Sequence, residues 1–371
     1  MTAAPASRSR RVLFVFAWLV VGGEETEVRL LARHLNPARY CIEVVACFRK
    51  LNMSEQTHVQ LAQLGVPVDR TPYVLSLEET IDYLAQKMVE YDLIVVCQGV
   101  REVYPALERM KPQCRPPLIE HGGLVSEALA GPKHLTARYV GVCASIRDAA
   151  ASLMPERSHH AIEIPSMVDL SEFDPEQRTA VRAKWGVAEG TTVAGWVGRL
   201  DRKKRVEDFI AAAALVREAA LSTRFLVIGG PDAFMPEYAH ELRALAHDLG
   251  LDGWLDFLGD RSDVPRLLSG LDIFVWLSQG EGMPHVINEA GAAGLPVIAT
   301  RDNGTEEQIV DGETGLFVPH RDPAAVAAAI ETLIADPGLR LRLGKNLRRK
   351  VACEYSVAAL IPQWERLFDE L

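Results

Sequence analysis

The sequence predicts an α/β protein made of two doubly wound parallel sheets, and three observations support this. Its 371 residues exceed the roughly 250–300 at which a single hydrophobic core stops growing, which favours two domains. Apolar runs of strand length alternate with longer amphipathic stretches, as in βαβ units. A proline-bracketed stretch at Pro165–Pro175 interrupts the alternation, which then restarts. We therefore expect two such domains with a cleft between them.

The first half of the chain supplies the first sheet. Val12–Ala17 is the first expected strand, and Glu24–Leu35 follows as a helix because its apolar residues recur at helical spacing. The other expected strands are Cys41–Phe48, Leu93–Cys97, Pro117–Glu120, Tyr139–Cys143 and Ala161–Ile164.

The first apolar run has a second interpretation. Arg8, Arg10 and Arg11 precede Val12–Val21, like the charged and apolar regions of a signal peptide. No small-residue cleavage site follows, so we favour a first strand preceded by a disordered tail. No segment reaches the ~20 apolar residues of a spanning helix. We therefore expect a cytoplasmic protein whose membrane contact, where there is any, is peripheral at the inner face.

The second half restarts the pattern after Pro165–Pro175, which reads as a linker. Its expected strands are Val193–Val197, Phe225–Ile228, Leu255–Phe257, Ile273–Leu277, Pro296–Ala299 and Leu316–Val318. From Asp322 onward the pattern is helical, and Val357–Leu371 carries an apolar stripe that needs a surface to cover. The expected domains are 1–168 and 169–356, with the helix 357–371 packing back on the first.

Composition excludes some classes of function. A formal net charge of -10 argues against a nucleic-acid protein, which would present a broad basic face. The six cysteines are scattered without a C-x-x-C pair, which indicates reduced, mostly buried thiols. The sequence also lacks a D-x-D pair, a G-x-S-x-G elbow and a G-x-x-x-x-G-K-[ST] loop. These absences disfavour metal-bridged diphosphate binding, hydrolase chemistry and a P-loop.

The most informative stretch is Glu281–Glu289, which reads E-G-M-P-H-V-I-N-E between two expected strands. Its two glutamates are eight positions apart, a little over two helical turns at about 3.6 residues per turn. If the helix began near Glu281, both carboxylates would face the same way. Ligands of open α/β sheets bind at the carboxyl ends of the strands, so a hydroxyl-rich ligand is expected here.

A basic run follows the first strand of the second domain. Gly198–Arg205 reads G-R-L-D-R-K-K-R, with five basic residues within seven positions. Arg199 and Lys204 fit a diphosphate clamp, and the alternative is a solvated loop. The place of the run at the carboxyl end of a strand favours the clamp.

Three smaller features also lie at strand ends. Gly22-Gly23 opens the first helix, where backbone N–H groups attract anions, although such a pair is also an ordinary turn. The Asn303–Glu307 segment is either a second turn or a contact to phosphate or sugar hydroxyls. His121 stands before two glycines. Its neutral imidazole could exchange a proton with a sugar hydroxyl, and the alternative is that His121 has a purely structural role.

Together these residues resemble family 4 of the retaining glycosyltransferases, which have the GT-B fold of two Rossmann-like domains facing a cleft. The resemblance is close over the second domain and loose over the first. It rests on Gly22-Gly23 with Glu25, Gly198–Lys204, Phe225–Gly230, Phe257–Gly259, Glu281–Glu289, Gly294–Thr300 and Glu307–Val318.

The resemblance implies a nucleoside-diphosphate-sugar donor, a hydroxyl acceptor, retention of anomeric configuration and no metal or other cofactor. It assigns Glu289 to the ribose, Glu281 to the transferred sugar, and Arg199 and Lys204 to the diphosphate. His121 would then lie near the reacting sugar from the acceptor side. The remaining donor-binding residues would be Gly22, Gly23, Gly282, Met283 and Pro284.

The chain departs from the family pattern at several places. Ser166 and Met167 replace an Asn and a Gly, Arg205 stands where a Gly usually follows the lysine, and Asn303 replaces a Gly. Two other classes of function stay open beside the glycosyltransferase, namely a nucleotide-sugar epimerase and a non-catalytic nucleotide-sugar-binding subunit. The base, the sugar and the acceptor (a glycan, a lipid-linked glycoconjugate or a natural product) are not readable.

Overall fold

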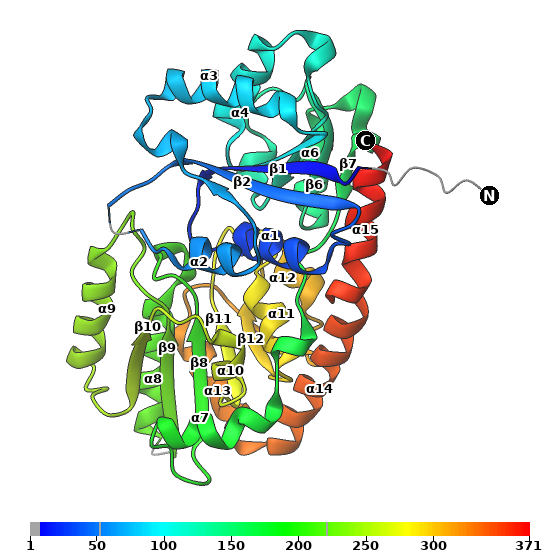
Figure 1. Cartoon of the computed structure of the whole chain (residues 1–371). Helices are drawn as coiled ribbons and strands as arrows, with labels where there is room; N and C mark the ends of the chain where they lie inside the picture. The colour runs from blue at the N-terminus through cyan, green and yellow to red at the C-terminus, as the bar shows by residue number, and fades with distance from the viewer. Residues whose placement is uncertain (1–7, 52, 220–221) are drawn as a thin grey trace. The chain divides into compact units, whose positions relative to one another are not determined.

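The computed structural model describes residues 8–51, 53–219 and 222–371, and the chain divides into two compact units (Figure 1). The first unit comprises the chain through Pro165 together with Leu360–Leu371, and the second comprises Ser166–Ala359. The expected disordered tail falls, over residues 1–7, outside the described residues.

The first unit is built on a seven-stranded sheet in the order β3-β2-β1-β4-β5-β6-β7, in which every paired strand is parallel. Its strands are β1 Arg10–Trp18, β2 Tyr40–Phe48, β3 Val68–Asp69, β4 Leu93–Cys97, β5 Leu118–Gly122, β6 Thr136–Gly141 and β7 Ala161–Glu163. Its α-helices are α1 Gly23–His34, α2 Gln56–Gln63, α3 Leu77–Lys87, α4 Val100–Arg109, α5 Val125–Ala128 and α6 Ala144–Ser152. Its 3₁₀ helices are η1 Thr71–Val74, η2 Met88–Glu90, η3 Pro112–Cys114 and η4 Pro155–His160.

Burial on both faces explains why these strands read as continuous apolar runs. Every residue of β4 is buried, as expected when helices cover both sides of a parallel sheet. Leu84 of α3 and Leu107 of α4 belong to one core with Leu13 and Ile94 of the sheet, while α1 lies on the opposite face (Figure 1). Two expectations were wrong in detail. The two-residue β3 was missed, and the predicted strand Tyr139–Cys143 ends at Gly141, because Cys143 already caps α6.

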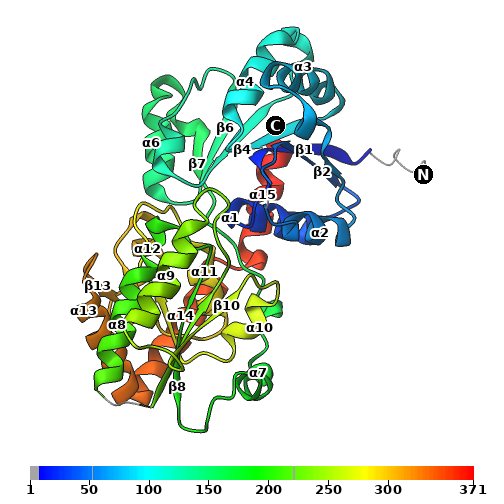
Figure 2. The same cartoon turned by 90° about the vertical axis from the view of Figure 1, so that its left-hand side faces the viewer.

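The last helix, α15 Val357–Glu370, buries its apolar stripe in the first unit. The Phe368 ring lies 5.7 Å from that of Tyr40 on β2, and the Trp364 indole nitrogen donates to Glu27 Oε1 of α1 at 3.2 Å. Figure 2 shows α15 beside α1 and the first strands.

The second unit carries a six-stranded parallel sheet in the order β10-β9-β8-β11-β12-β13. Its strands are β8 Thr192–Val197, β9 Thr223–Ile228, β10 Leu255–Gly259, β11 Ile273–Trp276, β12 Val297–Thr300 and β13 Gly315–Val318. Its α-helices are α7 Arg178–Lys184, α8 Val206–Glu218, α9 Glu237–Asp248, α10 Val264–Leu268, α11 His285–Ala292, α12 Asn303–Gln308, α13 Pro323–Ala335 and α14 Pro337–Glu354. Its 3₁₀ helices are η5 Leu170–Glu172, η6 Pro175–Gln177 and η7 Arg202–Lys204.

Two doubly wound parallel sheets are thus confirmed. In both sheets the order reverses beside the first strand, at β1/β4 and at β8/β11. Such a reversal opens a crevice at the carboxyl ends of the strands, where ligands of these folds bind. Over the described part of the chain, we find no helix with both the length and the apolar character needed to cross a bilayer.

Candidate active site

The basic run begins where the backbones after β8 and β9 approach each other closely. Gly198 follows β8 with φ +158°, and its N–H donates to the carbonyl of Ile228 at 2.9 Å. A Cβ on Gly229, which has φ +145°, would overlap the carbonyl oxygen of Gly198. Glycine is required at such an approach, and it fixes where the loop after β8 starts.

Lys204 is the best-defined cation of the run. Its Nζ lies 3.1 Å from Glu281 Oε1 and 4.6 Å from the centroid of the Trp276 ring. Trp276 of β11 in turn stacks on Trp196 of β8, with centroids 5.8 Å apart. An ion pair and an aromatic face together hold the ammonium group in place, at the reversal between β8 and β11.

Glu281 remains ionised although it is largely buried. Burial raises its pKa, but the charge and hydrogen bond of Lys204 outweigh this effect, so the net pKa lies below the usual value. An ionised carboxylate of this kind accepts hydrogen bonds from hydroxyl groups.

The helix does not begin near Glu281, so the condition under which both carboxylates would face the same way is not met. Helix α11 begins at His285, and Glu281 lies in the preceding loop. Pro284, with φ -63° and ψ 120°, caps the helix in an extended conformation, and a residue before proline is driven out of the helical region. Only Glu289 is therefore helical, whereas Gly282, Met283 and Pro284 form a buried part of the loop.

The start of α12 holds this loop in place. Asp302 Oδ2 accepts from Glu281 N at 2.8 Å, and Asn303 Nδ2 donates to Glu281 O at 2.9 Å. Gly304 N donates to the Gly282 carbonyl at 2.7 Å. A Cβ on Gly304 would lie only 2.5 Å from that oxygen. The Asn303–Glu307 segment thus opens a helix and positions Glu281, rather than forming a plain turn.

Three other cations of the run, Arg199, Arg202 and Arg205, have carboxylate partners of their own. Arg199 Nη1 lies 2.8 Å from the buried Asp232, while Arg202 pairs with Glu241 on the surface. Arg205 makes two 2.9 Å bonds to Asp208. The solvated-loop interpretation therefore describes Arg202, whereas Arg199 and Lys204 are each held by an ion pair with a carboxylate.

Arg205 adopts an unusual backbone conformation. Its φ of 51° and ψ of 45° are left-handed, and it caps α8. A residue with a Cβ costs about 1–2 kcal/mol there, which explains why a glycine would fit this position. The bidentate contact to Asp208 offsets part of this cost.

A buried polar network anchors the linker to α11. Ser166 Oγ donates to the Met283 carbonyl at 2.9 Å, and Asn288 Nδ2 donates to the Ser166 carbonyl at 2.7 Å. Gln308 Nε2 bonds both Pro284 O and Asn288 Oδ1. Ser166, which departs from the family pattern, thus helps to position the loop that carries Glu281.

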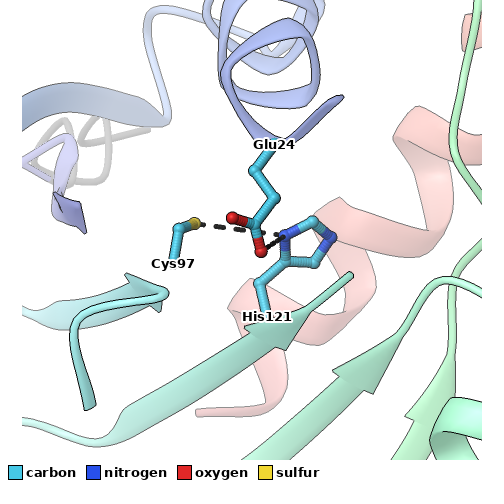
Figure 3. A group of neighbouring side chains, drawn as sticks. All are labelled: Glu24, Cys97 and His121. Atoms are coloured by element: carbon cyan, nitrogen blue, oxygen red, sulfur yellow. Dashed lines mark hydrogen bonds and ion pairs between the residues drawn. The ribbon is translucent and has the colours of Figure 1, made fainter. Parts of the chain in front are cut away.

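His121 lies in the first unit, at the end of β5. The β4–β5 register places Cys97 opposite His121, and Glu24 of α1 reaches the same point (Figure 3). Glu24 Oε1 lies 3.9 Å from His121 Nδ1, and Cys97 Sγ lies 4.0 Å from the same nitrogen. The Trp364 ring packs against the imidazole at 5.5 Å.

Burial suppresses charge in this cluster. It lowers the pKa of His121 to about 4, so the imidazole is neutral near neutral pH. Burial, followed by the charges of Glu127 and Glu25, raises the pKa of Glu24 well above its ordinary value. The thiol pKa of Cys97 is likewise raised by burial. The neutral imidazole expected from the sequence is therefore supported by its surroundings.

The glycine pair precedes this cluster. Gly22 is the N-cap of α1, and Gly23 is its first residue. A Cβ on Gly22 would lie 2.6 Å from Glu25 Oε2, and Glu25 Oε1 accepts from Val20 N at 3.0 Å. The pair therefore brings a carboxylate against the backbone after β1, and Gly23 stays exposed.

The structure brings some predicted site residues together and not others. Lys204 contacts Glu281, whereas Arg199 is tied to Asp232 and Glu289 lies along α11.

Sequence reasoning missed Trp276, Asp302, Asn288, Gln308, Glu24 and Cys97. Asp302 had a signal, since Asp before a short helix three residues ahead of Thr is a capping pattern. Glu24 and Cys97 had none, because only the fold brings them to His121. The thiol expectation was also partly wrong, because Cys41, Cys114 and Cys353 are exposed.

The fold is similar to that of solved glycosyltransferases. Two doubly wound parallel sheets form the GT-B architecture. HepE of Anabaena, solved with UDP and glucose, is similar over 97% of this chain and 99% of its own, with a TM-score of 0.83 and 21% identity. WaaG, a glycosyltransferase involved in lipopolysaccharide biosynthesis, is similar over 96% of this chain and 99% of its own, with a TM-score of 0.71 and 17% identity.

The second unit matches a known family model. Residues 177–350 match the model for glycosyl transferases group 1. A D-inositol 3-phosphate glycosyltransferase of Geodermatophilus obscurus is 33% identical over 251 residues, 65% of this chain and 53% of the relative. The putative glycosyltransferase EpsD of Bacillus subtilis is 33% identical over 195 residues, 53% of this chain and 50% of that protein. The matches thus span about half the length of these curated relatives.

Proposed function

We propose that this chain is a glycosyltransferase that moves a sugar from a nucleoside-diphosphate sugar to a hydroxyl acceptor. The observation that carries the proposal is the Lys204–Glu281 pair, with 3.1 Å between Nζ and Oε1, inside the group 1 domain. A cation for phosphate and a carboxylate for hydroxyls are the two groups that a sugar diphosphate needs. HepE, a structural relative, has been solved with UDP-glucose, which supports a donor of this kind.

Each donor-binding residue has a proposed role. Lys204 and Arg199 neutralise the diphosphate, and the partners Glu281 and Asp232 keep both cations oriented in the absence of donor. Glu281 accepts hydrogen bonds from the transferred sugar, and Glu289 from the ribose. The Gly282–Pro284 backbone, held by α12, lines the donor between them.

The proposed reaction retains the anomeric configuration and needs no metal. The bond from the sugar carbon to the diphosphate breaks, and the acceptor oxygen bonds to the same face of that carbon. The acceptor proton passes to the departing phosphate oxygen. Fixed cations stabilise the charge that develops on the leaving group, which is the task a metal ion would otherwise perform.

The proposed role of His121 belongs to the acceptor side of this reaction. With its pKa lowered to about 4 by burial, the imidazole exchanges a hydrogen bond with a sugar hydroxyl without carrying charge. Gly22 and Gly23, at the start of α1, would contact the nucleotide sugar through backbone N–H groups. If His121→Ala kept full transfer activity, this role would have to be abandoned.

The test incubates the purified chain with a panel of UDP-, GDP- and ADP-sugars. D-inositol 3-phosphate and simple glycosides serve as acceptors, since a relative is named for the first. We expect slow donor hydrolysis for one donor, and transfer once an acceptor fits. Proton NMR of the product should show the donor's own anomeric configuration, and activity should survive EDTA. Inverted product or complete loss in EDTA would overturn the mechanism, and no donor turnover at all would overturn the function.

A further inference from the structure

A second site in the first unit is formed by three side chains of different chemistry. Glu24, Cys97 and His121 come from the start of α1, the end of β4 and the end of β5 (Figure 3). Each offers one ligand atom, and these atoms all lie within 4.8 Å of one another. We propose that this triad binds Zn²⁺ or a similar thiophilic divalent cation, with a coordination position left open.

The distances suit such an ion. The spacings of 3.9 Å from Glu24 Oε1 to His121 Nδ1 and 4.0 Å from that nitrogen to Cys97 Sγ close a triangle whose third side is at most 4.8 Å. A point equidistant from the three atoms then lies no more than about 2.5 Å from each. Zinc bonds of about 2.3 Å to sulfur and 2.0–2.2 Å to nitrogen and oxygen require the atoms to close in by only a few tenths of an ångström.

The carboxylate of Glu24 provides independent evidence for a ligand. Glu24 is 7% exposed, and its Oε1 has no hydrogen-bond partner among the residues that the structure describes. Its other oxygen accepts from Gln98 Nε2 at 2.7 Å. Nearby carboxylates are already engaged, because Glu25 accepts from Val20 N and Glu127 from Gly123 N. The unpartnered oxygen is therefore the one aimed at the imidazole.

The surroundings favour a cation and hold the ligands ready. Glu25 and Glu127 add negative charge beside Glu24. Gln98 has a φ of 60°, a left-handed backbone conformation that residues other than glycine rarely adopt. The Gln98 side chain contacts Glu24 from this backbone conformation. The Trp364 ring fixes the imidazole plane. Strained residues and locked ligands are typical of functional sites.

The donor set selects the metal. A thiolate and an imidazole suit zinc, cobalt or cadmium, whereas magnesium and calcium prefer sets of oxygen ligands. On binding, the Cys97 thiol and the protonated Glu24 carboxyl release their protons to solvent and bind through Sγ and a carboxylate oxygen, while neutral His121 binds through Nδ1. Three protein ligands leave one position for water, as in open zinc sites.

Occupancy should also suppress transfer, and this part alone rests on the proposed function. A metal on Nδ1 holds His121 and blocks its hydrogen bond to a sugar. The triad would then be an inhibitory site of an enzyme that needs no metal for its reaction.

The binding test uses Co²⁺, because thiolate-to-cobalt charge transfer reports sulfur ligation directly. The exposed Cys41, Cys114 and Cys353 are first changed to Ser to remove adventitious thiols. In this background we expect one equivalent of Co²⁺ to give the charge-transfer band and Zn²⁺ to displace it, with no effect of Mg²⁺. Cys97→Ala should abolish the band, whereas Cys47→Ala, another buried cysteine, should leave it intact.

Glu24→Gln keeps the size and shape of the side chain and removes its charge. It provides a second test of the site in case Cys97→Ala does not fold. Loss of a direct ligand should weaken Zn²⁺ binding by more than the roughly 10- to 100-fold typical of a lost supporting partner. Glu102→Gln, at a buried glutamate of α4, should bind as the background does. Absence of the band in the folded background protein, or its persistence in Cys97→Ala, would overturn the site. Inhibition by Zn²⁺ that Glu24→Gln relieves would support the regulatory part. Full activity of the zinc-loaded protein would overturn that part, and absence of transfer without metal would instead count against the proposed function.

Discussion

Both units place ionisable side chains at the carboxyl ends of their parallel strands, but the ionisation states of these side chains differ between the two units. In the first unit, burial drives His121 and Glu24 toward their neutral forms. In the second, Lys204 keeps Glu281 ionised despite burial, and Arg199 pairs with Asp232. The same topology thus yields one site that avoids charge and one that is built from ion pairs. We expect the first to respond to pH and thiophilic metals, and the second to anions and charge substitutions.

The largest expected effect is in the ion-paired unit. Lys204→Ala should lower the transfer rate by roughly 10²–10³-fold, the usual loss when one group that stabilises transition-state charge is removed. Steady-state kinetics with the active donor measure this change. Arg202→Ala, at an exposed arginine paired with Glu241, should leave the rate nearly unchanged. Equal rates for Lys204→Ala and the wild type would remove the ion pair from the chemistry.

The next largest effect is the pH dependence of stability that His121 gives to the first unit. Because the pKa of folded His121 is lowered from 6.5 to about 4, the unfolded chain takes up a proton in that window and the folded chain does not. The free energy of unfolding should therefore fall as pH drops from 6.5 to 4, by up to about 3 kcal/mol from this group. Above pH 6.5 its contribution is fully present.

His121→Gln isolates this contribution. The raised pKa of Glu24 acts in the opposite sense, since the folded carboxyl holds a proton that the unfolded one releases, and both chains share this term. Urea unfolding at a series of pH values should show a shallower loss of stability in His121→Gln than in the wild type. Parallel curves between pH 6.5 and 4 would show that His121 is not buried as a neutral group.

A smaller effect concerns the loop that carries Glu281. Asp302→Ala removes the acceptor for Glu281 N and the cap of α12, and should cost about 1 kcal/mol of stability. Because the carboxylate loses its fixed position, transfer should fall roughly tenfold. Asp322→Ala removes a comparable cap from α13 and serves as the matched control. It should lose similar stability but no activity, and equal activity losses would refute the positioning role.

The smallest effect tests backbone strain in the basic run. Arg205→Ala loses the contacts to Asp208 and keeps the left-handed strain, whereas Arg205→Gly loses the contacts and the strain together. The glycine variant should therefore be more stable than the alanine variant by about 1 kcal/mol. Thermal unfolding of the two variants measures this difference, and the reverse order would contradict the assigned conformation.

Local pattern was enough to predict the fold class. Parallel strands buried on both faces leave continuous apolar runs, and Leu93–Cys97 was predicted with the bounds that β4 has. Bounds failed where capping competes with the strand, as at Cys143, and where pairing is too short to leave a pattern, as at β3.

The candidate site was less predictable because long-range contacts build it. Lys204 and Glu281 were both singled out, but 76 intervening residues hide their contact, which requires the parallel pairing of β8 with β11. Spacing alone could not tell where the helix begins, and it begins only at His285, after Pro284. Glu24 and Cys97 carry no local signal, because their chemistry depends on convergence with His121.

Donor binding tests the central claim most directly. Calorimetric titration of UDP-, GDP- and ADP-sugars should find one that binds the wild-type chain below millimolar concentration, within the usual range of enzyme–substrate affinities. Lys204→Ala should weaken that binding tenfold or more, because we propose that the ammonium held 3.1 Å from Glu281 neutralises the diphosphate. Absence of binding by every nucleoside-diphosphate sugar at millimolar concentration, or an unchanged affinity in Lys204→Ala, would contradict the account.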